Sequence, residues 1–192
     1  MAAPPRFEAE PENGNHALDL NLIAFNTRVR MHRDRIFGLA FHMLGNEAEA
    51  ADVTQDVFIR LWKHHERLEE DLILGWLLRV ARNACIDAMR RRKTRRTLFG
   101  ADPELMERVE GTDQSPEQSA SAALFRERLD EALECLGEPH RSIVVLREIH
   151  ECKYEEISET LDLPLNTVKV YLHRARKALR KELGEVMRHD YV

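Results

Sequence analysis

The chain has 192 residues, of which 43% are hydrophobic, 33% charged and only 6% aromatic. This length allows one domain or two small ones, and the scarcity of glycine and proline favours helices over a sandwich or barrel. The longest apolar stretch, residues 72–78, is far shorter than the roughly 20 residues that cross a bilayer, so no membrane insertion is expected.

The amino-terminal segment and the cysteines indicate a cytoplasmic location. No apolar segment follows the first methionine, and we therefore expect no secretory signal. The cysteines, Cys85, Cys135 and Cys152, are odd in number and widely spaced. This pattern is typical of reduced thiols rather than of a disulfide framework.

Charge is distributed very unevenly, although the net charge of −5 alone counts against nucleic-acid binding. Residues 79–96 carry eight Lys or Arg and one acid, and residues 169–181 carry six and none. Residues 47–71 carry eight acids against three bases, and residues 102–117 six against one. Two basic segments on an acidic chain predict two contacts with a polyanion and an acidic surface for another partner.

The predicted elements of the first half are a tail and three helices. Residues 1–18 contain three prolines and few apolar side chains, which indicates a mobile tail. Apolar periodicity predicts helices over residues 20–44, 46–66 and 72–93. Gly45 suits the position after a helix, and Asn46 suits an N-cap. In the second helix we expect Val53, Val57, Leu61 and Trp62 to face inward.

The second half begins with a predicted flexible linker over residues 95–115, which loses periodicity and contains Gly100, Pro103 and Gly111. Helices are predicted from Pro116 to about residue 136 and from Pro139 to about residue 151. The run at residues 143–146 could also form a strand, but its charged neighbours favour helix. The fold class is therefore all-α, with two small helical domains.

Residues 154–183 have the pattern of a helix-turn-helix, with a short helix, a break at residues 162–165 and a basic second helix. Asn166 or Thr167 is predicted to cap that helix. Its amino end would enter the major groove, and the later basic residues would reach phosphates. The alternative is an amphipathic helix with a solvated basic face. The proposed base readers are Thr167, Lys169, Val170, Tyr171 and His173, and the proposed phosphate contacts are Arg174 and Lys177.

The other basic segment follows a tryptophan and combines an apolar face with an arginine face. Such a helix can lie along a phosphate backbone, and Trp76 and Asn83 suit the capture of an unstacked base. The alternative is that its charge pairs with the acidic loop at residues 69–71. The candidate DNA-binding residues are Trp76, Arg79, Arg82, Asn83, Arg90 and Arg91.

Three segments together resemble a known family. Residues 52–62 are similar to the polymerase-binding motif of bacterial sigma factors, residues 75–87 with the following arginines to their −10-element helix, and residues 154–179 to their −35-element reader. The order, spacing and length resemble the two-domain extracytoplasmic-function (ECF) group. Without this resemblance, residues 52–62 also suit an ordinary core helix with solvated acids.

The resemblance implies a promoter-specificity subunit of bacterial RNA polymerase. Residues 19–94 would bind the clamp of the largest subunit and open the −10 element, and residues 116–188 would bind the −35 element and the flap of the second subunit. Control by an anti-sigma protein is also implied. The implied polymerase-binding residues are Asp52, Gln55, Asp56, Phe58, Arg60 and Trp62.

Several features depart from the family or point elsewhere. The acidic loop before Trp76 lacks the usual polar, aromatic pattern, and Ser158 stands where alanine is usual. The spacing of His140, His150 and the cysteines is not typical of zinc sites, so we expect no metal cofactor. No nucleophile-and-base pattern indicates catalysis, so we expect no cofactor of another kind and no enzymatic activity. A stand-alone dimeric regulator and an RNA-binding adaptor stay open as rival functions.

Overall fold

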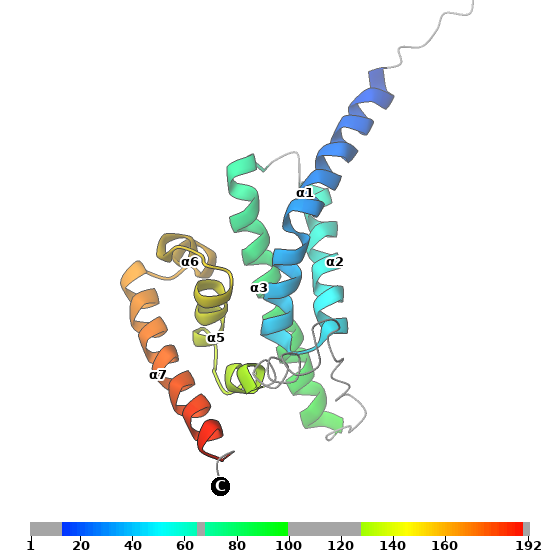
Figure 1. Ribbon diagram of the computed structural model, residues 1–192. Coiled ribbons are helices and arrows are strands. Elements are labelled where there is room, and N and C mark those ends of the chain that lie inside the picture. Colours follow the sequence, from blue (N-terminus) through cyan, green and yellow to red (C-terminus); the bar gives the residue numbers. More distant parts are fainter. Residues whose placement is uncertain (1–12, 65–67, 100–127, 190–192) are drawn as a thin grey trace, which may run out of the picture.

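The computed structural model describes residues 13–64, 68–99 and 128–189, and every regular element among them is a helix (Figure 1). Three long helices form the first half: α1 (Asn13–Leu44), α2 (Glu47–His64) and α3 (Glu70–Phe99). After a helical stretch at residues 128–134, the second half contains α5 (His140–Val144), the π-helical turn η3 (Val145–Ile149), α6 (Tyr154–Leu161) and α7 (Leu165–His189). The predicted all-α class is confirmed.

The first domain is a three-helix bundle whose core lies where the apolar periodicities meet. Leu39, Leu61 and Leu77, one from each helix, are fully buried in it. Gly45 ends α1 with a φ of 66°, a left-handed conformation that glycine adopts without strain. The Asn46 side chain then accepts a hydrogen bond from the Glu49 amide at 2.8 Å, so the predicted N-cap is confirmed.

The second domain packs α5, η3, α6 and α7 around an aliphatic core that includes Ile143, Leu146, Ile157 and Leu172. Helices α6 and α7 form the predicted helix-turn-helix. Asp162, in a left-handed conformation, turns the chain between them. The unusual Ser158 has a structural role there, because its hydroxyl donates to the Leu163 carbonyl at 2.5 Å and ties α6 to the turn.

Some sequence expectations are wrong in detail. Helix α1 begins at Asn13, within the predicted tail, and α3 continues to Phe99, within the predicted linker; the rest of both segments, residues 1–12 and 100–115, lies outside the described residues. Helix α7 already contains Leu165, so neither Asn166 nor Thr167 caps it. Trp62 is 41% exposed rather than inward-facing, because it lies on the open side of α2.

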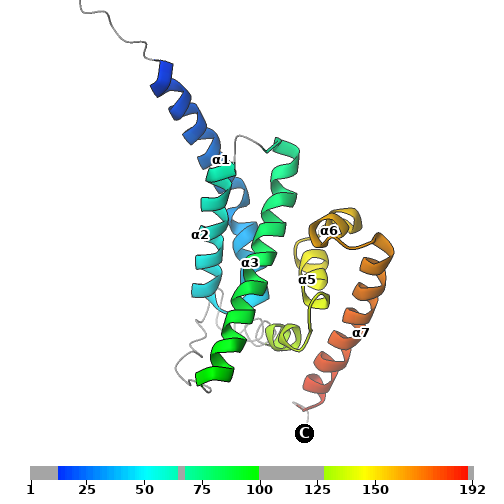
Figure 2. The same cartoon turned by 180° about the vertical axis from the view of Figure 1, so that it is seen from behind.

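The two domains lie side by side, with α5 and α6 against α3 in both views of the ribbon (Figures 1 and 2). Contacts join α3 to α6 and α1 to η3. No helix among the described residues has the length and apolar character needed to cross a membrane.

Candidate functional site

The first candidate surface is an acidic face of α2. Asp52, Gln55 and Asp56 are all exposed. Their spacing of three and four residues places them on one side of the helix, and Arg60, also exposed, follows Asp56 by one turn. The structure therefore brings these four predicted residues together on one surface.

An apolar groove of about 900 Å³ adjoins this face, between α1 and α2. Phe25 and Trp62 meet there edge to face, with ring centroids 4.9 Å apart. Phe58 lines the groove but is only 7% exposed, so most of its side chain supports the bundle. Ile59, which the sequence interpretation omitted, is 44% exposed in the same groove. The apolar pattern of α2 does not identify Ile59 as a surface residue, because an isoleucine next to Phe58 is equally consistent with a buried position.

The second candidate surface is the basic face of α3. Asn83, Arg90 and Arg91 are exposed, whereas Trp76 is partly buried, with its ring edge-on to that of His64 at a centroid distance of 6.0 Å. The Arg90 guanidinium is near the Asp87 carboxylate at 3.6 Å on the same helix. The alternative interpretation pairs the arginines of α3 with the acidic loop at residues 69–71. Glu70 of that loop pairs with Arg28 of α1 instead, at 2.6 Å.

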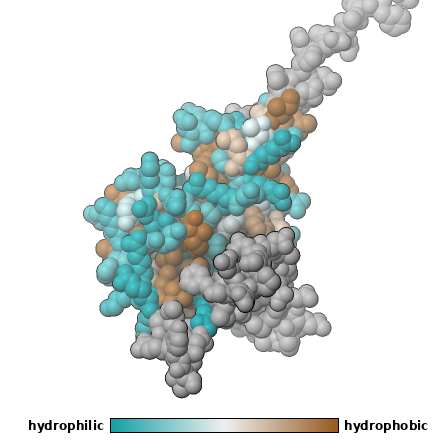
Figure 3. Space-filling model, viewed as in Figure 1, coloured by the Kyte–Doolittle hydropathy of each residue, from teal (hydrophilic) through white to brown (hydrophobic). Residues whose placement is uncertain are grey.

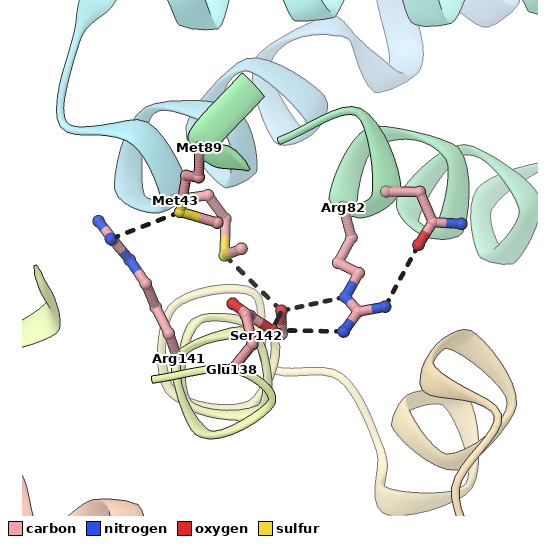
Figure 4. Close-up of polar contacts among 7 residues, drawn as sticks. Met43, Arg82, Met89, Glu138, Arg141 and Ser142 are labelled. Carbon is pink, nitrogen blue, oxygen red and sulfur yellow. Dashed lines mark hydrogen bonds and ion pairs between the residues drawn. The ribbon is translucent and has the colours of Figure 1, made fainter. Parts of the chain in front are cut away.

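Two of the predicted arginines on α3 contact the second domain. Arg82 donates from Nε to the Ser142 hydroxyl at 3.2 Å and from Nη2 to the Glu138 carboxylate at 3.3 Å (Figure 4). Arg79 donates to the backbone carbonyl of Glu159 in α6. No local sequence pattern predicts these contacts, because they join residues 56 to 80 positions apart.

The third candidate surface is an exposed stripe along α7. Lys169, Val170, His173, Arg174 and Lys177 are all exposed, at spacings of three and four residues. Asn166 and Arg180 extend the stripe at either end and were missed, although the same spacing could have identified them.

Two predicted base readers lie to one side of this stripe. Thr167 is partly buried, and the Tyr171 ring packs against His140 with centroids 4.9 Å apart. Tyr171 therefore also supports the packing of α7 on α5. The Lys169 ammonium lies over the Tyr154 ring at 5.9 Å from its centroid, a distance at which a cation is attracted to an aromatic face.

A neighbouring arginine has a partner within the chain. Arg176 makes two hydrogen bonds to the Glu148 carboxylate, at 2.9 and 2.7 Å. This pair ties α7 to η3. Arg174 and Lys177, on either side of Arg176 in the sequence, are exposed and belong to the stripe.

The thiols occupy different environments. Cys85 and Cys152 are buried and Cys135 is exposed. Burial raises the pKa of the Cys85 thiol to about 12 and also raises that of Cys152, so both are protonated at neutral pH. Among the described residues, no cluster of three or more His, Cys, Asp or Glu side chains is arranged to hold a metal ion.

Comparison with known proteins matches a segment in each half of the chain. Residues 28–95 match the family model of Sigma-70 region 2, and residues 126–179 match that of Sigma-70 region 4. The chain is 38% identical to the ECF RNA polymerase sigma factor SigE of Mycolicibacterium smegmatis, over 82% of this chain and 60% of SigE. It is 31% identical to SigW of Bacillus subtilis, over 85% of this chain and 90% of SigW.

The chain belongs to the ECF RNA polymerase sigma factors. The fold of this sigma factor is similar to that of the sigma factor RpoE, solved with the anti-sigma factor NepR from Bartonella quintana, with a TM-score of 0.67 and 20% identity over 84% of this chain and 97% of RpoE. It is also similar to CnrH, solved with the cytosolic domain of CnrY, with a TM-score of 0.64 and 24% identity over 89% and 94% of the two chains.

The family match places the three surfaces within defined regions of the sigma factor. The acidic face of α2 and the basic face of α3 lie within the part that matches region 2. The α7 stripe lies within the part that matches region 4, up to residue 179.

Proposed function

We propose that this sigma factor uses α2 to bind core RNA polymerase and α3 and α7 to contact promoter DNA. Its function is that of a dissociable promoter-specificity subunit, which directs transcription initiation and has no catalytic chemistry of its own. The observation that carries this proposal is the presence of one acidic and two basic surfaces on three different helices of one chain. A stand-alone regulator needs only the α7 stripe.

The α2 surface suits a protein partner. A basic, amphipathic helix can place positive side chains against Asp52, Gln55 and Asp56 and apolar side chains in the adjoining groove. We assign the clamp of the largest polymerase subunit as this partner. Arg60 and Trp62 would lie at the edge of the contact, and Phe58 would support the floor of the groove.

The α3 surface suits DNA with an open strand. Arg79, Arg82, Arg90 and Arg91 supply positive charge for a phosphate backbone, and Asn83 offers both a donor and an acceptor to a base. The Trp76 ring supplies a flat apolar surface on which an unstacked base of the −10 element can rest. Binding the unpaired strand in this way favours the melted promoter over the duplex.

The α7 surface suits duplex DNA. The amino-terminal end of the stripe, with Lys169, Val170 and His173, would face base edges of the −35 element, while Arg174 and Lys177 contact phosphates. Val170, which is 48% exposed, offers an apolar contact for a thymine methyl group. The packing of Tyr171 on His140 favours a supporting role for that ring, and Thr167 lies at the margin of the contact.

The domain boundaries and further partners follow from the same assignment. Residues 19–94 would form the polymerase and −10 domain, residues 95–115 the linker and residues 116–188 the −35 domain, which also binds the flap of the second large subunit. We assign a cytoplasmic location, where core polymerase is found, and an anti-sigma protein as the regulator.

Promoter binding with and without core polymerase tests this proposal. The chain and core enzyme together are expected to bind a specific subset of genomic fragments, whereas neither binds them tightly alone. Tight, specific binding of duplex DNA by the chain alone would favour the stand-alone regulator, and polymerase-independent affinity for RNA would favour the adaptor.

A further inference from the structure

The first turn of α3 is exposed on three successive residues. Glu70, Asp71 and Leu72 all face solvent, and Ile73 is the first buried side chain of the helix. Figure 1 shows this turn at the end of the bundle from which α1 extends, and hydrophilic side chains cover it in the space-filling view (Figure 3). The first amides of a helix have no partners within the helix, and such ends fray. A contact from another element is therefore needed to hold the start of α3 in place.

Arg28 of α1 supplies such a contact. Its guanidinium donates from Nε and from Nη2 to the same oxygen of the Glu70 carboxylate, at 3.0 and 2.6 Å. The Arg28 side chain is only 16% exposed, whereas that of Glu70 is 62% exposed. Arg28 is thus held within the bundle, and its two donors fix the direction of the Glu70 carboxylate. Because an ion pair with an exposed partner adds little to stability, the main effect of this one is on placement.

The same end of the bundle presents the tryptophan assigned to the unstacked base. Trp76 follows Glu70 by six residues, about 9 Å along the helix axis. Its ring is edge-on to that of His64, the last residue of α2, at a centroid distance of 6.0 Å. In an α-helix each amide donates to the carbonyl four residues earlier, so the Trp76 backbone depends on the first turn through Leu72. Fraying of that turn would loosen the platform for the base.

We propose that Arg28 and Glu70 are a positioning pair, which holds the first turn of α3, and with it Trp76, in the orientation that accepts the unpaired −10 strand. This inference rests on the proposed function, since it assumes that Trp76 contacts −10 DNA. Arg28 acts through Glu70, and Glu70 acts through the helix that it begins. Loss of the pair should weaken binding of the unpaired strand and leave binding of the −35 duplex unchanged.

Two DNA probes separate these two contacts. The first is the upstream duplex of a promoter fragment selected with the holoenzyme, which contains the −35 element and ends before the −10 element. The second is the same duplex extended by the unpaired −10 strand. The measured quantity is the gain in holoenzyme affinity on adding the strand, which is a ratio of two dissociation constants. The fraction of active sigma factor cancels in this ratio, so a variant that is merely less stable leaves the gain unchanged.

Removal of either charge of the pair should lower the gain. Arg28→Gln and Glu70→Gln should each reduce it at least threefold, while the dissociation constant for the duplex probe stays within twofold of the wild type. The two variants change the net charge in opposite directions. If charge alone mattered, loss of the Glu70 carboxylate would strengthen phosphate binding and raise the gain. An unchanged or larger gain for Glu70→Gln would therefore overturn the proposal.

Reversal of the pair tests whether the two side chains act on each other. Arg28→Glu alone and Glu70→Arg alone should both lower the gain, although Glu70→Arg adds a positive charge. The double variant should recover at least half of the loss, since the pair is restored in the opposite sense. A double variant as poor as the worse of the two single variants would contradict a direct pair.

Controls separate placement from loss of charge and from loss of fold. Arg30→Gln makes the same substitution as Arg28→Gln at an exposed arginine two residues along α1, and it should leave the gain unchanged. Circular dichroism and co-elution with core polymerase check each variant. If Arg28→Gln loses helicity, the result for Glu70→Gln, a change at an exposed side chain, decides.

The wild type distinguishes failure of this inference from failure of the proposed function. A wild-type holoenzyme that gains no affinity from the unpaired strand would contradict the assignment of α3 to −10 DNA. A clear gain in the wild type that Arg28→Gln and Glu70→Gln retain in full would overturn the positioning pair alone.

Discussion

Loss of phosphate contacts from α7 should change the salt dependence of promoter binding by a calculable amount. Arg174 and Lys177 are exposed on one face, three residues apart, so each is assigned one phosphate. Each lost contact lowers the slope of log K against log salt by about 0.9. When the salt concentration rises from 50 to 200 mM, the affinity of the wild type should therefore fall about 3.5-fold more than that of a single alanine variant, and about 12-fold more than that of the double variant.

The assay compares holoenzymes that contain wild-type, Arg174→Ala or Lys177→Ala sigma factor on the same promoter fragment at several salt concentrations. Arg176→Ala is the matched control, because Arg176 already pairs with Glu148 and should change the slope much less. A second arm repeats the measurement on fragments with randomised −35 sequences. The affinity lost on removal of a phosphate contact should be the same for all of them.

Two results would refute this placement of α7. Unchanged salt slopes for both variants would mean that neither cation meets a phosphate. A loss of affinity confined to certain −35 sequences would mean that these side chains contact base edges and that the helix is docked differently. Lys169→Ala provides the contrast, since it should alter the preference at one base position.

Two other substitutions test the surfaces on α2 and α3, and a third tests the pH dependence of stability. Asp56→Arg should weaken co-elution with core polymerase while helicity is retained, and unchanged co-elution would contradict the assignment of α2. Asn83→Ala should reduce transcription from a duplex promoter and recover in part on a pre-melted one, because the cost of unstacking is removed; an equal loss on both templates would contradict a role in opening. Burial, with Arg35 and His42 nearby, lowers the pKa of His150 to about 4 in the folded chain. Since the unfolded chain binds the proton near pH 6.5, the free energy of unfolding should fall as the pH is lowered from 6.5 towards 4, by at most about 1.4 kcal/mol per pH unit, and His150→Asn should reduce this slope.

The helices and the helix-turn-helix could be predicted from the sequence because both depend on local patterns. The apolar spacing of α2 predicts that Val57 and Leu61 are buried, and both are fully buried. Gly45 and Asn46 mark the junction of α1 and α2 through backbone geometry and a single side-chain hydrogen bond. These features need no information from the rest of the chain.

The relation between the domains could not be predicted in the same way. The partners of Arg82 lie 56 and 60 residues away, and nothing near Arg82 distinguishes it from the exposed Arg90. Hydrophobicity alone predicts an inward-facing Trp62, although its ring lies against Phe25 in the groove between α1 and α2. An apolar side chain at a protein-binding surface has the same local pattern as one in a core.

The most direct measurement of the central claim is permanganate footprinting of unpaired thymines on promoter fragments selected with the holoenzyme. Core polymerase with the wild-type chain should make thymines of the −10 element reactive, while core polymerase alone, the chain alone and the holoenzyme with Asn83→Ala should leave them largely protected. Reactivity that is equally strong with core polymerase alone, or no reactivity in any mixture, would contradict the assignment of this chain as the subunit that recognises and opens the promoter.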